Sequence, residues 1–539
     1  KDSAEMKKII ARMEDLNNFI VGTTLEKDNA EAFKEKGNEL LKSIKSLAEM
    51  TENYVNTKNP WFAEGKARLK IVKQINDRLQ RDIIGMEEKI NDFQYLPEDE
   101  KARINSWTDF LNFQRTVHLV DGKNGVKISN TGGNTSDVIV IEKNGQKFFF
   151  KEEEKLPSDD FGTIMKNVTK DAKKDRGDKP VEKGSVESYV DEFLKCFNKE
   201  ISRFDTNELF AGLLSGGKAE NSYKGIKESL KTFGIMFSSQ TGQLVYDIDK
   251  LSDEKKKKEI QDKLGQIFND IRKDFVMGEI GAHTTKIKAG EEMAKRNVAT
   301  ARLANLLGLG DVVPTSEMAT IEVNGEKKYG VIMGEAEGQE TSKVIMGKNK
   351  EEHKDKLITY TGNAIKDSLN LQVLDILCGQ TDRHSGNRMS KIVETKKKGV
   401  YAISKVTGID GDLSFGTRDY ETLKVEDQTG FGLPAMSEDV AERILALDPA
   451  ILDYEMLGLL NKKERKALKE RLQGMQAAIK KRKEYEKKNP TKAKRFLKDE
   501  EWDAFTTVLR DKAKKSTSLL KSLGKTYITP SILLGMKMK

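Results

Sequence analysis

Two Asn-Gly pairs, each between β-rich segments, constrain the fold of this chain more than any other feature of its sequence. Asn144-Gly145 separates the segments 137–142 and 147–153, and Asn324-Gly325 separates two further segments of the same kind. The Asn-Gly dipeptide accommodates the positive φ angles of a two-residue turn, so each pair predicts an antiparallel hairpin. Helical patterns follow the second hairpin. Strands first and helices afterwards, with a hinge between them, predict an α+β fold with two lobes.

The first hundred residues predict helices throughout. Apolar residues recur there at helical spacing, for example Met6, Ile9, Met13, Leu16 and Ile20. We expect residues 1–117 to form a small antiparallel helical bundle that serves packing or docking and carries no chemistry of its own.

Two further helical regions interrupt and follow the β-rich part. Residues 156–288 predict a helical insertion, which starts with a linker rich in Lys, Asp and Gly at 166–187. This insertion either holds a substrate or regulator or is a helical decoration. Residues 476–539 predict a helical C-terminal extension, whose basic stretch at 480–498 is diluted by acidic residues, so a solvated face is favoured. The apolar tail at 528–534 is a candidate to dock back on the fold.

Composition argues against several classes of function. The net charge of +8 rests on 95 basic and 87 acidic residues, a mixed surface that predicts no specific nucleic-acid partner. No apolar run approaches the ~18 residues that a membrane helix needs, so no transmembrane segment is expected. Two cysteines in separate segments and four scattered histidines predict neither a disulfide framework nor a zinc site.

The first residues, KDSAEMKK, contain no initiator Met and no apolar core of a signal peptide. We therefore expect a protein that is cytoplasmic or delivered into a host cell, with a lost export signal as the alternative. The sequence leaves the oligomeric state open.

The stretch 378–416 is the strongest candidate for a functional site. A buried helical pattern ends there and opens a polar loop, CGQTDRHSGNRM, which is followed by a glycine-broken turn, GIDGDLSFG. Asp382 and Asn387 are five residues apart, the spacing at which phosphotransferases place a hydroxyl-orienting Asp and a metal-binding Asn. Asp410 in the turn adds a carboxylate. Magnesium takes a few hard oxygen ligands and keeps its other positions for water and phosphate.

The motifs DRHSGN and IDGDLSFG resemble the catalytic and metal-binding loops of atypical kinases of the phosphoinositide-kinase-like and actin-fragmin-kinase-like superfamily. The resemblance covers roughly residues 126–472. It implies a two-lobed protein-kinase-like fold with an N-lobe at 118–338 and a C-lobe at 339–475. It also implies ATP and magnesium as cofactors and a protein or lipid (phosphoinositide) hydroxyl as the acceptor, and it does not choose between these acceptors.

Three residues upstream are candidates to bind the nucleotide phosphates. Lys151 closes a strand directly after three phenylalanines, which matches the position from which kinases reach the phosphates. Gly132 and Gly133 lie between two strands, where their main-chain N–H groups are candidates to face phosphate oxygens. The alternatives are a strand-end lysine and an ordinary turn.

The next candidates follow the insertion. Glu292 lies on the predicted helix 290–307 and is the candidate to pair with Lys151, as the corresponding helix acid does in kinases. Glu291 is the alternative, since relatives often carry this acid nearer to the position of Asn297. Met333 and Glu335 fall at the glycine-bounded link after the second hairpin, where kinases bind adenine through main-chain groups.

The sequence predicts that the two acids of the glycine-broken turn, Asp410 and Asp412, are not held in place equally well. Asp410 follows the apolar Ile409, so a short strand can aim its carboxylate at the nucleotide. Asp412 follows Gly411 and has less reason to be held. We therefore assign the metal to Asp410 and treat Asp412 as a possible second ligand.

The resemblance implies a division of roles. Lys151 would hold the phosphates, Asn387 and Asp410 the metal, and Asp382 the attacking hydroxyl. His384 is the other candidate proton acceptor, since a neutral imidazole works near neutral pH. Two other classes stay open, namely a nucleotide-binding pseudokinase that acts as a scaffold and an enzyme that transfers AMP from the same site.

Overall fold

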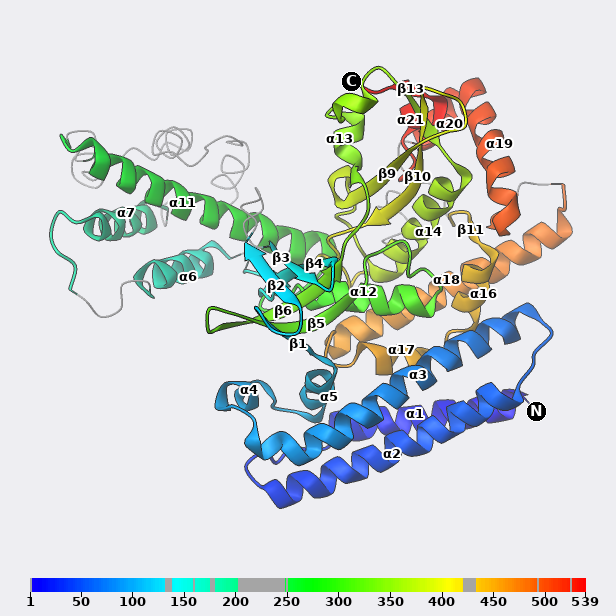
Figure 1. Cartoon of the computed structure of the whole chain (residues 1–539), viewed down its shortest axis with the longest axis horizontal. Coiled ribbons are helices and arrows are strands. Elements are labelled where there is room, and N and C mark those ends of the chain that lie inside the picture. Colours follow the sequence, from blue (N-terminus) through cyan, green and yellow to red (C-terminus); the bar gives the residue numbers. More distant parts are fainter. Residues whose placement is uncertain are drawn as a thin grey trace. The chain divides into compact units, whose positions relative to one another are not determined.

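The computed structural model describes residues 2–130, 138–158, 160–174, 180–201, 248, 251–419, 433–491, 494–523 and 526–539. The chain forms two compact units, a main unit of Lys1–Glu154 with Glu292–Lys539 and an insert unit of Lys155–Glu291. The main unit combines helices with a six-stranded and a five-stranded sheet, which confirms the α+β class (Figure 1).

The six-stranded sheet contains both predicted hairpins. Its strands are β1 (Val117–Val120), β2 (Val126–Asn130), β3 (Val138–Lys143), β4 (Gln146–Glu152), β5 (Ser316–Val323) and β6 (Glu326–Gly334), in the order β1-β5-β6-β4-β3-β2. Asn144 and Asn324 have φ angles of 52° and 53° in the two turns, as the Asn-Gly pairs predict. Helix α12 (Lys295–Leu306) packs against β5 and β6.

The five-stranded sheet carries the predicted polar stretch. Its strands are β7 (Gln339–Glu340), β8 (Leu357–Tyr360), β9 (Arg388–Glu394), β10 (Val400–Gly408) and β13 (Met536–Lys537), in the order β13-β8-β10-β9-β7. Helix α14 (Gly362–Cys378) packs against β10. The loop from α14 to β9 holds the DRHSGN motif, and the IDGDLSFG motif follows β10. Because β9 and β10 are antiparallel and pair Arg388 with Gly408, the two motifs meet at one end of the hairpin.

The N-terminal residues form the predicted helices. They are α1 (Asp2–Gly22), α2 (Ala30–Thr57), α3 (Ala63–Asp92), η1 (Phe93–Tyr95), α4 (Glu98–Arg103) and α5 (Trp107–Arg115). Their buried side chains belong to the same apolar cluster as those of α16 (Glu438–Ala446), α17 (Pro449–Met456) and α18 (Lys462–Lys488). The bundle therefore shares one core with the helices α16, α17 and α18 of the main unit, whereas the six-stranded sheet also has a smaller apolar cluster of its own.

Short elements complete the main unit. They are α13 (Thr341–Ile345), η3 (Glu351–His353), η4 (Ser385–Asn387), β11 (Met436–Ser437), β12 (Phe496–Leu497), η5 (Asp499–Glu501), α19 (Trp502–Lys515), α20 (Thr517–Leu523) and α21 (Pro530–Leu534). The tail docks as the sequence indicates, because Ile528, Ile532 and Leu533 are buried and β13 pairs with β8.

The insert unit has a helical core of its own. It is built from α6 (Phe161–Lys174), α7 (Val186–Ile201) and α11 (Glu254–Glu279), and the last of these continues into a π-helical turn at Ile280–Thr285. The prediction of a linker from residue 166 is wrong for its first part. Residues 166–174 are helical, because Phe161, Ile164 and Val168 bury one face of α6 in this core.

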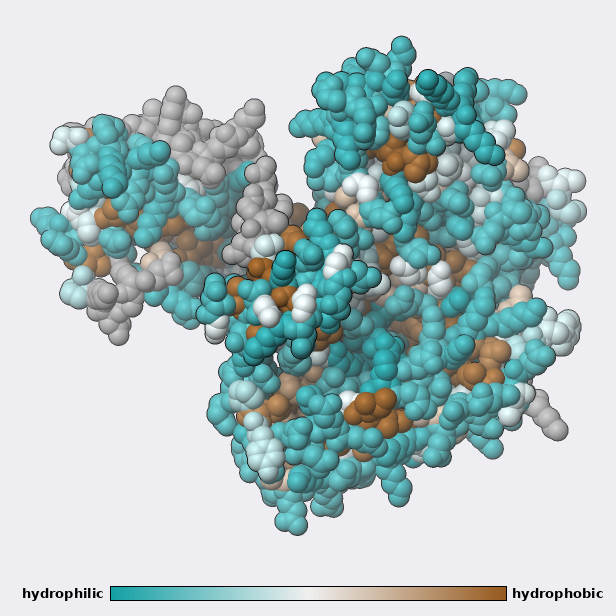
Figure 2. All heavy atoms as spheres, in the orientation of Figure 1, coloured by the Kyte–Doolittle hydropathy of each residue, from teal (hydrophilic) through white to brown (hydrophobic). Residues whose placement is uncertain are grey.

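Polar side chains dominate the face of the molecule shown in Figure 2, where apolar residues form small, separate patches. This agrees with a chain in which charged residues make up 34% of the sequence. In the part of the chain that the structure describes, no helix has both the length and the apolarity to cross a membrane.

Candidate active site

Lys151 lies in β4, between Val138 of β3 and Val331 of β6. Its Nζ is 3.2 Å from Oδ1 of Asp410 and also donates to Oδ2 of Asp412. Residues far apart in the sequence, from the six-stranded sheet and from the turn after β10, therefore meet at one ammonium group.

The charges of Lys151, Asp410 and Asp412 shift one another's pKa values. At Asp410 burial opposes ionisation, but the Lys151 ammonium outweighs it and lowers the pKa of the carboxyl. At Asp412 burial dominates and, with the adjacent Asp410 charge, raises the pKa to about 6 against the pull of Lys151. Burial also opposes the charge of Lys151, whose pKa is nevertheless raised by the two carboxylates.

The turn after β10 is held by main-chain bonds from three directions. Asp410 adopts a left-handed conformation, with a φ angle of 59°. Its carbonyl accepts from Nε2 of Gln380 at 3.1 Å, and the N–H of Ile409 donates to the carbonyl of Asn387 at 2.9 Å. The N–H of Gly411 donates to Oδ1 of Asn297 at 2.7 Å. The main chain at Asp410 is therefore held by the loop from α14 to β9 on one side and by α12 on the other.

The loop from α14 to β9 brings the DRHSGN side chains together. Nδ2 of Asn387 donates to the carbonyl of Asp382 at 2.8 Å and lies 3.4 Å from its Oδ2. The main-chain N–H of Asp382 donates to Oε1 of Gln380 at 2.9 Å. Burial raises the pKa of Asp382, in part against the opposing charge of His384. Gln380 thus links the Asp382 loop to the Asp410 turn.

His384 is less well placed to accept a proton. Its Nδ1 accepts the N–H of Gly386 at 3.0 Å, so the proton of a neutral imidazole lies on Nε2. That nitrogen is 4.0 Å from Oδ1 of Asp382. In this tautomer Nδ1 already accepts a hydrogen bond and Nε2 carries the proton. This arrangement favours Asp382 as the candidate proton acceptor.

The buried side chain of Arg383 supports both the DRHSGN loop and the turn after β10. The guanidinium of Arg383 binds Asp375 of α14 at 2.9 and 3.2 Å and also donates to the carbonyls of Asn387 and Ile409. Tyr527 of the C-terminal tail donates to the same Asp375 at 2.7 Å. The motif residue Arg383 therefore has a structural role, and the sequence gives no signal that Tyr527 shares its partner Asp375.

Glu292 does not lie at Lys151, which corrects the prediction for this acid. Helix α12 begins at Lys295, because the carboxylate of Glu153 accepts the N–H groups of Met293, Ala294 and Lys295 at 2.7, 2.6 and 2.8 Å. Glu292 precedes the helix and pairs with Lys295 at 2.9 Å. Nδ2 of Asn297 donates to Oδ1 of Asp412 instead.

The expectation that Asp412 is weakly held is also wrong. Its side chain is 9% exposed and bonds to both Lys151 and Asn297, whereas that of Asp410 is 43% exposed. The sequence argument failed because it considered the neighbours along the chain and could not place α12 against the turn.

The candidate adenine contacts lie at the end of the second hairpin. Met333 of β6 pairs with Phe149 of β4, and Glu335 forms an exposed ion pair with Lys147 at 3.5 Å. Their contact with adenine stays a prediction. Gly132 and Gly133 lie outside the described residues.

Magnesium binding by Asp410 and Asn387 stays a prediction. The amide nitrogen of Asn387 donates to the carbonyl of Asp382, so its amide oxygen is the atom left as a candidate metal ligand. Within the described residues, no three or more His, Cys, Asp or Glu side chains are grouped as a metal site. One carboxylate and one amide make a smaller site than such a group and leave magnesium its positions for water and phosphate.

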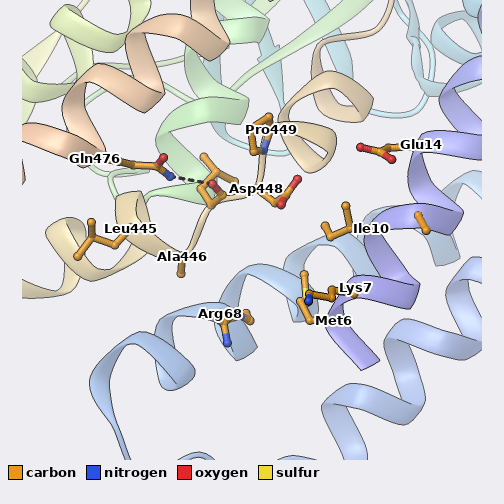
Figure 3. A pocket seen from close by; sticks show the side chains of 12 residues that line it. Met6, Lys7, Ile10, Glu14, Arg68, Leu445, Ala446, Asp448, Pro449 and Gln476 are labelled. Atoms are coloured by element: carbon orange, nitrogen blue, oxygen red, sulfur yellow. Dashed lines mark hydrogen bonds between the residues drawn. The ribbon is translucent and has the colours of Figure 1, made fainter. Parts of the chain in front are cut away.

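A cavity of about 460 Å³ lies elsewhere in the main unit, between α1, α3 and the α16–α18 region (Figure 3). Its polar lining serves the local fold. Asp448 caps α17 by accepting the N–H of Ala450, Gln476 donates to the carbonyls of Ile444 and Leu447, and Arg68 pairs with a glutamate of its own helix. The cavity therefore adds nothing to the site around Lys151.

Comparison with known proteins finds no matching family model and no matching curated protein. A function for this chain is therefore inferred from its own residues and their geometry.

Proposed function

We propose that this chain is an ATP- and magnesium-dependent phosphotransferase with a two-lobed, protein-kinase-like fold. The observation that supports this proposal is the ion pair between Lys151 and Asp410, 3.2 Å long, beside a loop that holds Asp382 and Asn387. Kinases bring a strand lysine and a metal-binding Asp to the same phosphate groups and place a catalytic Asp and a metal-binding Asn in the adjacent loop. The acceptor class is a protein or phosphoinositide hydroxyl.

In this reaction each residue has one task. Lys151 would contact the phosphates of ATP, and Asn387 and Asp410 would hold magnesium, which would neutralise charge on the phosphate oxygens. Asp382 orients the acceptor hydroxyl and takes its proton as the oxygen attacks the γ-phosphorus. The bond from the γ-phosphorus to the bridging oxygen breaks, and ADP leaves with the electron pair.

Incubation with magnesium and ATP labelled at the α- or γ-phosphorus tests the proposal, with protein and phosphoinositide acceptors in parallel. Transfer of the γ-label supports it. Transfer of the α-label alone would instead indicate AMP transfer, and nucleotide binding without transfer or hydrolysis would indicate a scaffold.

Lys151→Met is the diagnostic variant for this experiment. We expect it to lose transfer and to weaken ATP binding by roughly 1.5–3 kcal/mol, the value of one charge-assisted contact. The matched control is Lys328→Met, which removes another lysine of the same sheet, one that pairs with Glu152 at 3.0 Å. If Lys151→Met and Lys328→Met both retain wild-type binding and turnover, Lys151 is an ordinary strand-end residue.

A further inference from the structure

Asp412 is more enclosed than the other two candidate acids, Asp382 and Asp410. One carboxylate oxygen, Oδ2, accepts from the ammonium of Lys151, and the other, Oδ1, accepts from Nδ2 of Asn297. Its side chain is 9% exposed. Both oxygens are therefore fixed by partners from different elements, β4 and α12.

The amide of Asn297 holds this arrangement through both of its ends. Its nitrogen donates to Asp412, and its oxygen accepts the N–H of Gly411 at 2.7 Å. A Cβ atom placed on Gly411 would lie 3.1 Å from that oxygen and 3.1 Å from Oγ1 of Thr300. Helix α12 thus lies directly against the turn, and a single amide sets the orientation of the Asp412 carboxylate.

The neighbouring acid has the opposite character. The Asp410 side chain is 43% exposed, and its contact with Lys151 is 3.2 Å long. A metal ligand must reach both phosphate and solvent, which suits Asp410. A carboxylate that orients a lysine must itself be fixed, which suits Asp412.

We propose that Asp412 is the carboxylate that aims Lys151 at the nucleotide phosphates, and that Asn297 is the positioning residue that fixes Asp412. This inference rests on the proposed phosphotransferase function and deepens it. The task that the sequence assigns to Glu292 on the helix is performed by an acid of the metal-binding turn, and α12 contributes through an amide.

The first test is the ATP affinity of Asp412→Asn, measured by calorimetry with magnesium and with a chelator. We expect binding about tenfold weaker in both conditions, because Lys151 loses its charged partner. Adding Lys151→Met should then weaken binding by less than it does in the wild type, since the two residues act as one unit. Affinity equal to or tighter than wild type, or a loss confined to the magnesium condition, would overturn the proposal.

The second test exchanges the two side chains. Asn297→Asp alone places two carboxylates face to face, and Asp412→Asn alone removes the acid. The combination Asn297→Asp with Asp412→Asn restores one acid and one amide at the contact, with Gly411 still bonded to residue 297. We expect the combination to exceed both single variants in melting temperature and to exceed Asp412→Asn in ATP affinity. Additive losses in the combination would show that the two residues do not act through each other.

Glu292→Gln is the matched control, because it removes an acid that pairs with Lys295. It should bind ATP like the wild type. If Glu292→Gln weakens binding and Asp412→Asn does not, the helix acid has its expected role and the proposal falls. Absence of ATP binding by the wild type would reject the phosphotransferase function, and this inference with it. If the wild type binds ATP and Asp412→Asn binds it with the same affinity, this inference alone is rejected.

Discussion

In the proposed phosphotransfer, the hydrogen bonds of Asp382 and His384 predict which of the two residues accepts the proton of the acceptor hydroxyl. Nδ1 of His384 accepts a main-chain N–H at 3.0 Å, whereas the contact that Oδ2 of Asp382 makes with Nδ2 of Asn387 is longer, at 3.4 Å. We expect Asp382→Asn to bind magnesium-ATP normally but to lower kcat by about 10²–10⁴-fold, and His384→Ala to lower it far less. Calorimetry and steady-state kinetics of both variants measure these effects.

Asp410→Ala is the comparison variant for the same experiment. It removes an oxygen ligand and a negative charge from the magnesium site, so ATP binding should lose its dependence on magnesium. The assigned roles would be reversed if Asp382→Asn lost magnesium-dependent binding while Asp410→Ala kept it.

At the scale of elements, the contact between α14 and β10 predicts a dependence of stability on pH. Asp367 of α14 accepts the N–H of Val406 at 3.2 Å, and burial raises its pKa to about 6 against that bond. In the unfolded chain an Asp titrates near pH 4, so between about pH 4 and pH 6 the folded state binds more protons. The free energy of unfolding contributed by this group therefore falls as the pH rises through that window.

Asp367→Asn tests this dependence, because the amide keeps an oxygen for Val406 and carries no charge. We expect the variant to be more stable than the wild type at about pH 7, by about 1–3 kcal/mol, and to differ little from it at about pH 4. Urea unfolding at both pH values provides the measurement. Asp499→Asn is the control, because its side chain is 85% exposed. Its free energy of unfolding should match that of the wild type at both pH values. A variant less stable than the wild type at both pH values would contradict the assignment.

Elements were predictable where the signal is local. The hairpin turns depend on Asn144 and Asn324 themselves, and the spacing of apolar residues placed most helices. The start of α12 depends on Glu153, which is 142 residues from Lys295 and caps the helix from the residue directly after β4. Sequence spacing alone therefore put Glu292 inside the helix and at the wrong partner.

The candidate site, like the elements, was predictable only where the signal is local in the sequence. The motif residues Asp382, Asn387 and Asp410 carry a recognisable spacing, and the fold brings Asp410 to Lys151. The roles of Asn297 and Asp412 depend on how α12 packs against the turn, which no spacing along the chain encodes. The resemblance of the motifs to atypical kinases implied an acid nearer to Asn297, and the amide at that position was the available signal.

At the scale of the whole molecule, the carboxylate of Asp82 connects a buried ion pair inside the N-terminal bundle to Tyr454 in the rest of the main unit. Asp82 of α3 binds Arg115 through two bonds of 2.8 and 2.6 Å and accepts from the hydroxyl of Tyr454 on α17. Asp82→Ala leaves the buried guanidinium without its charge partner, so we expect a loss of about 3–5 kcal/mol of unfolding free energy. Denaturant unfolding measures this loss.

Glu39→Ala is the control for that measurement. It breaks the exposed pair of Glu39 with Lys36, which should cost at most about 1 kcal/mol. Equal losses in Asp82→Ala and Glu39→Ala would show that the buried pair of Asp82 and Arg115 contributes no more to stability than an exposed pair.

Deleting the N-terminal bundle and deleting the insertion should have different effects, because the bundle belongs to the core of the main unit and the insertion is an added unit. A fragment that begins at Asp121 loses the apolar side chains that α1, α2 and α3 contribute to the shared core, and we expect it to aggregate. Removal of residues 156–290 should be tolerated, because the insert unit has its own core and the N–H of Met293 donates to the carbonyl of Glu154 at 2.9 Å. A short Gly-Ser linker can therefore close the gap with little strain. Circular dichroism and melting temperature decide the outcome. A folded fragment from Asp121, or an unfolded chain without the insertion, would contradict this division of the molecule.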